Sequence, residues 1–191
     1  EQDKAKFEVC NHKYTDLSET RYGVSILNDC KYGISVKDSR MHLSLHKGGV
    51  RPDWTGDHGK HRCTYVFHPH RGGFGAEQVI KPAYELNYPV LTADTAAAKP
   101  SFVRVDADNV VIETVKPCED AQRAYILRMY EAEGCHCRAA LIFRDSNVKL
   151  YATDMLEENA VPCDTTLSFR PFEIKTIKVD QNVKVVNAAG V

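Results

Sequence analysis

The chain has 191 residues, which is enough for one large or two small domains, and 27% of them are charged, with a formal net charge of −1. Since there is no basic excess, the composition does not favour a partner such as nucleic acid or an anionic membrane. The longest apolar runs are far shorter than the roughly 18–20 residues that a membrane-spanning helix needs, and residues 1–9 are too charged for a signal peptide.

The first half of the chain alternates between apolar and polar residues with a period of two. The pattern covers YGVSIL at 22–27, MHLSLH at 41–46 and RCTYVFH at 62–68. Such alternation, rich in β-branched and aromatic residues, predicts strands whose two faces differ in polarity.

The first of these runs ends in a turn with unusual chemistry. Asn28-Asp29 is ordinary turn sequence, but Asp29 is followed at once by Cys30, Lys31 and Tyr32. An acid, a thiol, a base and a phenol thus stand in successive positions. The turn is either part of a hairpin whose polar side chains only order the backbone, or the rim of a site.

One segment of the first half breaks the two-residue period. The apolar residues of GAEQVIKPAYELN, at 75–87, recur at helical offsets: Val79, Ile80, Ala83 and Tyr84. Pro82 lies inside this segment and would kink or end a helix. We therefore expect one short helix near 75–88, or two turns.

The second half follows a segment that lacks large apolar side chains. TADTAAAKP, at 92–100, is typical of a linker, which we place at 93–100. Strand-like runs then recur with turn residues between them: NVVIETV (109–115), AYILRMYEA (124–132), AALIF (139–143), TLSF (166–169) and FEIKTIKV (172–179). Short strands at this spacing indicate a sandwich, because one sheet face must be covered by another.

Seven cysteines at irregular spacing do not suggest a disulfide framework. We expect most of them to be buried thiols in a reducing compartment, while secretion stays open if six of them pair. Cys135 and Cys137 would share a face of a strand, so both thiols could reach one metal ion or partner. Packing is the more ordinary role for such a pair.

Histidines form the densest set of potential metal ligands. HGKH at 58–61 and HPH at 68–70, with Cys63 between them, could supply nitrogen and sulfur to a zinc ion. The ligands would be drawn from His58, His61, His68 and His70. Their spacing fits no standard zinc signature, and histidines that only form hydrogen bonds are the alternative.

Two further features of the first half suit carbohydrate chemistry. Asp29, Asp53 and Asp57 lie near turns, and glycoside cleavage needs two carboxyl groups at a defined separation, which a sequence does not give. Solvated loop acids are the ordinary alternative. Trp54 follows Asp53, and an exposed indole beside an acid could stack on the face of a sugar. A lone tryptophan is, however, more often packed in the protein interior.

Several motifs occur in order along nearly the whole chain. In the first half they are DLSE (16–19), YGVSILNDCKYGISV (22–36), LSL (43–45), PD (52–53), D-x-G-x-H (57–61), TYVFHPH (64–70) and AYELNYPV (83–90). In the second half they are VIETVK (111–116), ILRMYEAEG (126–134), TDMLEE (153–158) and FRPFEIKTIKV (169–179). Together they resemble the C-terminal β region of glycoside hydrolase family 38, the α-mannosidases, and are most similar to its cytosolic branch.

The resemblance implies an all-β fold. Residues 1–92 would form the later half of the family's C-terminal super-sandwich, which is galactose-mutarotase-like, and residues 101–191 a smaller antiparallel β-sandwich. The family hydrolyses α-mannosides with retention, using an Asp nucleophile, a second acid and a zinc ion bound by two His and two Asp. Those groups belong to an N-terminal catalytic domain outside these residues. We therefore expect no catalytic residue, no metal ligand and no cofactor here, and no activity from this chain alone.

The expected partners are that catalytic domain, on the same polypeptide, and the α-mannoside substrate, in the cytoplasm. Half a sandwich leaves sheet edges and an apolar face that something must cover. We therefore expect the first part of the chain to depend on further polypeptide, or to self-associate as a homo-oligomer.

In some family members a basic residue of this β region reaches the bound sugar. The nearest equivalents are His46 and Lys47; relatives often carry Arg here, and Lys keeps its charge but loses its bidentate fork. Asp29, Lys31 and Tyr32 are the other rim candidates, although Asp29 could instead accept local backbone N–H bonds. The alternative functions are an independent carbohydrate-binding β-sandwich module and a structural metal-binding sandwich.

Overall fold

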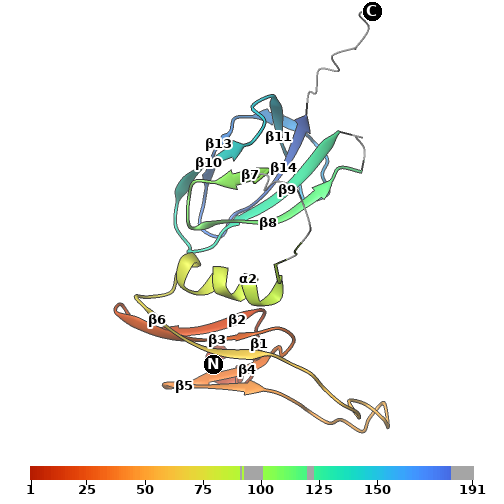
Figure 1. Ribbon diagram of the computed structural model, residues 1–191. Coiled ribbons are helices and arrows are strands. Elements are labelled where there is room, and N and C mark those ends of the chain that lie inside the picture. Colours follow the sequence, from red (N-terminus) through yellow and green to blue (C-terminus); the bar gives the residue numbers. More distant parts are fainter. Residues whose placement is uncertain (91, 93–100, 120–122, 182–191) are drawn as a thin grey trace, which may run out of the picture. The chain divides into compact units, whose positions relative to one another are not determined.

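The computed structural model describes residues 1–90, 92, 101–119 and 123–181. Its contacts divide the chain into two compact units, Glu1–Ala93 and Asp94–Val191 (Figure 1). Nearly all regular structure is antiparallel β-sheet, so the predicted all-β class is confirmed. The predicted linker at 93–100 lies outside the described residues, and the assignment of the two parts to particular family domains stays a prediction. No described helix is long and apolar enough to cross a membrane.

The first unit contains a short helix, α1 (Gln2–Ala5), and two three-stranded sheets. One sheet has the order β1-β4-β5, formed by Val9–Cys10, Gly33–Lys37 and Arg40–Ser44. The other has the order β2-β3-β6, formed by Tyr14–Ser18, Tyr22–Asn28 and Tyr65–Arg71.

Strand β6 begins later than the sequence suggested and runs through the HPH motif. The expected strand covered 62–68, whereas β6 starts at Tyr65 and ends at Arg71. Pro69 is compatible with this strand because β6 lies at the edge of its sheet, where a missing N–H breaks no ladder. The prediction was wrong at both ends because the pairing with β3 begins only at Tyr65 and continues through Pro69 to Arg71.

A helical segment covers one face of the β2-β3-β6 sheet (Figure 1). It consists of the π-helical turn η1 (Ala76–Ile80) and the helix α2 (Lys81–Asn87). Val79 and Ala83 pack on Leu27 of β3, and all three are buried. The predicted short helix is confirmed, and Pro82 does not end it. Pro82 lies in the first turn of α2, where its fixed φ suits a helix and its missing N–H is not needed.

A buried polar cluster lies on the same face of this sheet. Asp16 Oδ1 accepts hydrogen bonds from Ser25 Oγ at 2.7 Å and from His70 Nε2 at 2.8 Å. Burial by itself raises the pKa of Asp16, but hydrogen bonds from Ser18, His70 and Ser25 outweigh it and lower the pKa overall. His70 reaches Asp16 by crossing over Gly23, where a Cβ would lie 2.5 Å from the imidazole Cε1.

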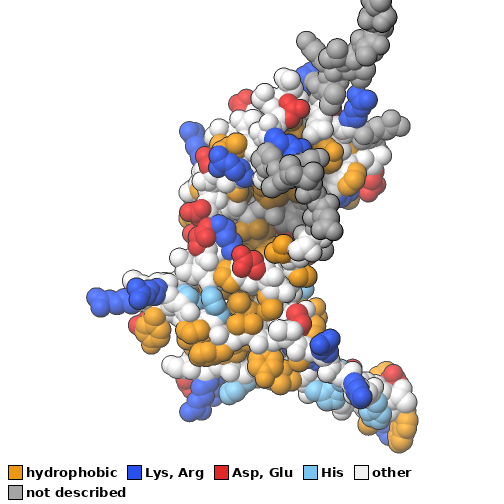
Figure 2. Space-filling model, viewed as in Figure 1, with side chains coloured by type: hydrophobic (Ala, Val, Ile, Leu, Met, Phe, Trp, Pro, Cys, Tyr) orange, Lys and Arg blue, Asp and Glu red, His pale blue; other side chains and the backbone are white. Residues whose placement is uncertain are grey.

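The opposite face of the β2-β3-β6 sheet is not covered. Phe67 is 72% exposed although it lies in the middle of β6. Cavities of about 680 and 250 Å³ separate this face from strand β5. We call this surface the open apolar face; its main residues are Leu17, Tyr22, Val24, Ile26, Tyr65 and Phe67 of the sheet and Met41, Leu43 and Leu45 of the β5 segment. Hydrophobic side chains gather over the strands of the first unit in Figure 2, so the expected uncovered apolar surface is present.

The second unit is a two-sheet sandwich. Its larger sheet has the order β12-β11-β14-β9-β8 and its smaller sheet the order β13-β10-β7. The strands are β7 (Val103–Val105), β8 (Val110–Pro117), β9 (Ala124–Glu131), β10 (Cys137–Phe143), β11 (Val148–Thr153), β12 (Val161–Cys163), β13 (Thr166–Phe169) and β14 (Ile174–Gln181). The core includes Leu127, Leu141, Phe169 and Ile177, so residues of both sheets meet there. All five strand-like runs are confirmed; β7, β11 and β12 were not predicted.

A fully buried carboxylate, Glu131, ends strand β9. Its Oε2 accepts the backbone N–H groups of Gly134 at 2.8 Å and Phe172 at 3.0 Å, and its Oε1 accepts those of Glu133 at 2.9 Å and the Asn109 side-chain amide at 2.9 Å. One side chain thus joins three connecting segments of the sandwich.

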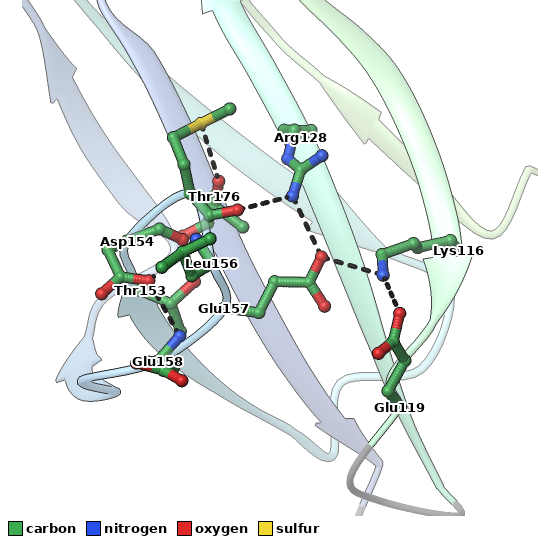
Figure 3. A network of polar contacts seen from close by, with 10 residues as sticks. Lys116, Glu119, Arg128, Thr153, Asp154, Leu156, Glu157, Glu158 and Thr176 are labelled. Atoms are coloured by element: carbon green, nitrogen blue, oxygen red, sulfur yellow. Dashed lines mark hydrogen bonds and ion pairs between the residues drawn. The ribbon is translucent and has the colours of Figure 1, made fainter.

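The TDMLEE motif builds a turn that is tied to the larger sheet (Figure 3). Asp154 Oδ1 accepts the backbone N–H groups of Leu156 at 3.0 Å and Glu158 at 2.9 Å. Glu157 Oε1 lies 2.9 Å from Lys116 Nζ of β8 and 3.0 Å from Arg128 Nη2 of β9. These contacts give this motif a structural role.

Candidate functional site

The pairing of β4 with β5 brings the predicted rim residues together. The two strands are antiparallel, with Gly33 opposite Ser44. The residues that precede β4 therefore lie beside those that follow β5. These two segments carry four of the five candidates: Lys31, Tyr32, His46 and Lys47.

The same four side chains line one cavity of about 300 Å³. A neighbouring cavity of about 530 Å³ is also lined by Lys31 and His46. We call the two together the rim cleft; the other polar residues along it are Glu8, Cys30, Ser44, Asp57, His58, His61 and Cys63. Figure 2 shows histidine and basic side chains along the loop at 45–64 that extends from the first unit.

Asp29, the fifth candidate, lines neither cavity of the rim cleft. Its Oδ1 accepts the backbone N–H of Thr64 at 2.9 Å, and its own N–H donates to the Thr64 carbonyl at 3.2 Å. A hydrogen bond from the Cys30 thiol, followed by that from Thr64, lowers the pKa of Asp29. The carboxylate orders the backbone here, which was the structural alternative for this residue.

Asn28 fixes the turn that carries the rim residues. It is almost fully buried, and its Oδ1 accepts the backbone N–H of Lys31 at 2.9 Å. The Tyr32 carbonyl in turn accepts the N–H of Asn11 at 2.7 Å. The Tyr32 ring stacks on His12, with centroids 5.2 Å apart. The turn is therefore held from both sides, with its Lys and Tyr side chains directed along the cleft.

Basic, acidic and imidazole groups are mixed in the rim cleft. Glu8 accepts a hydrogen bond from the Ser44 hydroxyl, beside Gly33, where a Cβ would lie 2.7 Å from the carboxylate. His61 Nε2 donates to the Asp57 carbonyl at 2.8 Å, and its ring centroid lies 4.9 Å from that of a second histidine, His46. Such groups can donate to and accept from the hydroxyls of a sugar. The geometry suits binding, and it assigns no nucleophile.

The histidines proposed as metal ligands do not form one site. His58 and His61 lie on the rim cleft, whereas His68 and His70 lie within β6. His68 Nε2 donates to the Gln78 carbonyl at 2.8 Å and His70 Nε2 to Asp16. Within the described residues, no group of three or more His, Cys, Asp or Glu could hold a metal ion.

Trp54 is 78% exposed, on the loop at 45–64. The expectation that a lone Trp would be packed is therefore wrong for this unit. Trp54 lines neither cavity of the rim cleft.

All seven cysteines are free thiols, and none is fully buried. Cys10, Cys30 and Cys135 are exposed, and the other four are partly buried. The expectation of buried thiols was wrong because these residues lie at strand ends and in loops. Cys135 and Cys137 do not share a strand face as expected, since β10 begins only at Cys137.

Sequence reasoning missed Glu8 and Ser44 as residues of the cleft. Asp57 was considered only as an acid near a turn, and His61 only as a metal ligand. The signal that could have found Ser44 is the hairpin register, because pairing Gly33 with Ser44 places it beside the NDCKYG turn. Glu8 lies there because Val9 pairs with Ile34, whereas the positions of Asp57 and His61 depend on the path of the loop.

Two family models match the chain, one in each unit. The model described as the glycosyl hydrolases family 38 C-terminal domain matches residues 1–55. The model described as that family's C-terminal beta sandwich domain matches residues 109–177.

Characterised relatives match over nearly the whole chain. Alpha-mannosidase 2C1 of Homo sapiens is 38% identical over 188 residues, and Alpha-mannosidase G of Dictyostelium discoideum is 34% identical over 197 residues. The matches cover 92% and 94% of this chain but only 18% of each relative. A solved structure of a glycosyl hydrolase family 38 protein from Enterococcus faecalis has a TM-score of 0.69 at 17% identity, over 90% of this chain and 22% of that one, which shows a shared fold.

Proposed function

Since the chain belongs to glycosyl hydrolase family 38, as part of its C-terminal domains, we propose that it is the C-terminal β region of an α-mannosidase. The observation that carries this proposal is 38% identity over 92% of the chain to a relative named as an α-mannosidase. The chain spans only 18% of that relative. The proposed retaining chemistry, with its acid, nucleophile and zinc ion, therefore belongs to a catalytic domain on further polypeptide, in a cytoplasmic enzyme.

The open apolar face supports a role as a buttress for that domain. A sheet face with Phe67 at 72% and Tyr65 at 57% exposure is not a stable solvent surface. We propose that further polypeptide of the same enzyme covers it. Burial of these side chains would then hold the rim cleft in a fixed position at the sugar site.

A direct test is an assay of residues 1–191 with a chromogenic α-mannoside and added zinc. We expect no turnover above that of a mock purification, whereas a complete enzyme carrying this region should be active. If mannosidase activity follows residues 1–191 through successive chromatography columns, the catalytic groups lie within these residues. The proposal that they belong to a separate catalytic domain would then be wrong.

In the complete enzyme, Lys47→Ala should reduce kcat/KM for an α-mannoside by about tenfold or more. Hydrogen bonds to a charged group contribute roughly 1.5–3 kcal/mol when no water replaces the partner, and Lys47 lines the rim cleft. The matched control is Lys37→Ala, which removes an exposed lysine of β4 outside the cleft and should leave kcat/KM unchanged. Equal effects of the two substitutions would remove Lys47 from the sugar site.

The exposure of Trp54 favours a second candidate, an independent carbohydrate-binding module. Because Trp54 is the only tryptophan in the chain, its fluorescence reports on this residue alone. Saturable quenching by mannose in residues 1–191, lost in Trp54→Ala, would support this module. An unchanged emission spectrum would leave the buttress role as the better account.

A further inference from the structure

We propose that Cys30 and Cys63 form a reversible disulfide that links the two chain segments at the base of the rim cleft. The structure contains both residues as free thiols, one exposed and one partly buried. Cys30 lines one cavity of the cleft, and Cys63 lines the other.

The strand register places the two cysteines opposite each other. The β3–β6 ladder ends with Asn28 opposite Tyr65. Asp29 and Thr64 stay in contact one step further: the Asp29 N–H donates to the Thr64 carbonyl at 3.2 Å, and the Thr64 N–H donates to the Asp29 carboxylate at 2.9 Å. The next facing positions are 30 and 63. Facing residues of antiparallel strands have Cα atoms roughly 4.5–5.5 Å apart, which lies within the roughly 4.4–6.8 Å that disulfides span.

The Cys30 side chain already crosses toward the opposite segment. Its Sγ donates to the carbonyl oxygen of Arg62 at 3.7 Å, and this oxygen belongs to the peptide group that joins Arg62 to Cys63. The Asp29 carboxylate, with a smaller contribution from Cys63, raises the pKa of Cys30. Cys30 is therefore a protonated thiol before it is oxidised.

Oxidation would close a covalent loop around the cleft. Residues 31–62, which lie between the two sulfurs, include all of β4 and β5 and the cleft residues from Lys31 to His61. A bond at the base of this loop restricts how far its two ends can separate. Control of sugar binding by this bond rests on the proposed function, whereas formation of the bond does not.

The reaction balances with hydrogen peroxide as the oxidant. The thiolate of one cysteine attacks a peroxide oxygen, the O–O bond breaks, and a sulfenic acid and one water result. The second thiolate attacks the sulfenic sulfur, the S–S bond forms, the S–O bond breaks, and a second water leaves. Two thiols lose two electrons, and one peroxide is reduced to two waters. A dithiol reductant reverses the change.

The test is peptide mapping after oxidation of the native chain. Residues 1–191 are treated with hydrogen peroxide, blocked with N-ethylmaleimide and digested with trypsin. Trypsin releases Cys30 in the peptide 22–31 and Cys63 in the peptide 63–71. We expect these two peptides to appear joined, two hydrogens lighter than their sum, and to separate again after treatment with dithiothreitol.

Two variants make the result decisive. Cys63→Ser should abolish the joined species and leave the Cys30 peptide unjoined to any other cysteine. The double variant Cys135→Ser and Cys137→Ser, which removes the other neighbouring pair of thiols, should leave it unchanged. Separate, fully alkylated peptides 22–31 and 63–71 from oxidised native protein would overturn the proposal, as would a dominant bond from Cys30 to any other cysteine. In the complete enzyme, a confirmed bond without any change in KM would count against the rim cleft as a sugar site and not against the disulfide.

Discussion

Glu131→Gln should lower the free energy of unfolding of the second unit by about 3–5 kcal/mol, the cost of removing one partner from a buried charged network. The carboxylate accepts backbone N–H groups from Glu133, Gly134 and Phe172. Glutamine would replace one acceptor oxygen by an NH₂ group that points at donors. The loss should be measured by urea titration, with hydrogen exchange at the amides of β9 and β14 identifying the unit that opens.

The backbone geometry around Glu131 explains why a hydrogen-bond acceptor with two oxygens is needed at this position. Gly134 has φ +75° and Phe172 φ +57°, so both turns are in the left-handed region. A Cβ at Gly134 would lie 2.7 Å from the Phe172 ring. Gly134 adopts this conformation freely, whereas Phe172 adopts it at a cost, and the carboxylate between the two turns accepts the N–H groups of both residues.

The same residue predicts an acid-sensitive sandwich. Burial raises the pKa of Glu131, but the N–H groups of Phe172 and Glu133 and the Asn109 amide outweigh it and lower the pKa from 4.5 to about 2. A folded-state pKa below the unfolded one stabilises the fold above about pH 4.5, and this stabilisation is lost as the pH falls toward 2. The shift corresponds to roughly 3 kcal/mol.

The control for both measurements is Glu158→Gln, which changes an exposed carboxylate of the same unit. It should leave the urea midpoint within experimental error and keep the acid transition. Glu131→Gln should instead flatten the dependence of stability on pH between about 4.5 and 2. If the two variants unfold alike, the network at the end of β9 does not stabilise the sandwich.

Phe67→Asp should weaken self-association of residues 1–191 by at least tenfold. Without the polypeptide that we propose as its cover, the open apolar face has only a second copy of the chain to bury it. A charged side chain in its centre opposes that contact, and a loss of about 1.4 kcal/mol changes an association constant tenfold. Sedimentation equilibrium measures the constant directly.

Because Phe67 is 72% exposed, its replacement should not unfold the first unit. Circular dichroism of the variant checks this point. The matched control is Leu156→Asp, which charges an equally exposed residue, at 79%, in the second unit, and should leave the association constant unchanged. Wild-type chain that stays monomeric at high concentration would show that the face needs no cover.

The strands that alternation identified are those with one face on a core. β9 and β14 bury Leu127, Met129, Ile177 and Val179 in a regular pattern, and such a pattern is visible in sequence because burial follows the two-residue period. β7 and β12 were missed because three residues are too few to show any period. Their positions depend on pairing with longer strands.

The candidate site was only partly accessible to sequence reasoning. The dense chemistry of the NDCKYG turn directed attention to Lys31 and Tyr32, which do line the cleft. The opposite wall depends on hairpin register and on the path of a long loop, which local sequence does not determine. Asp29 has the same residue type as a catalytic acid, and only its bond to the Thr64 N–H distinguishes the structural role.

The crossing of His70 over Gly23 couples two positions that are far apart in the sequence. Any side chain at 23 would lie within 2.5 Å of the imidazole and 2.4 Å of Ser18 Cβ. Evolution can therefore enlarge residue 23 only where both Ser18 and His70 make room, and loss of His70 removes the imidazole partner of the Asp16 carboxylate. Across descendants of this sequence, positions 16, 18, 23 and 70 should therefore change together, and a single substitution at position 23 should be rare.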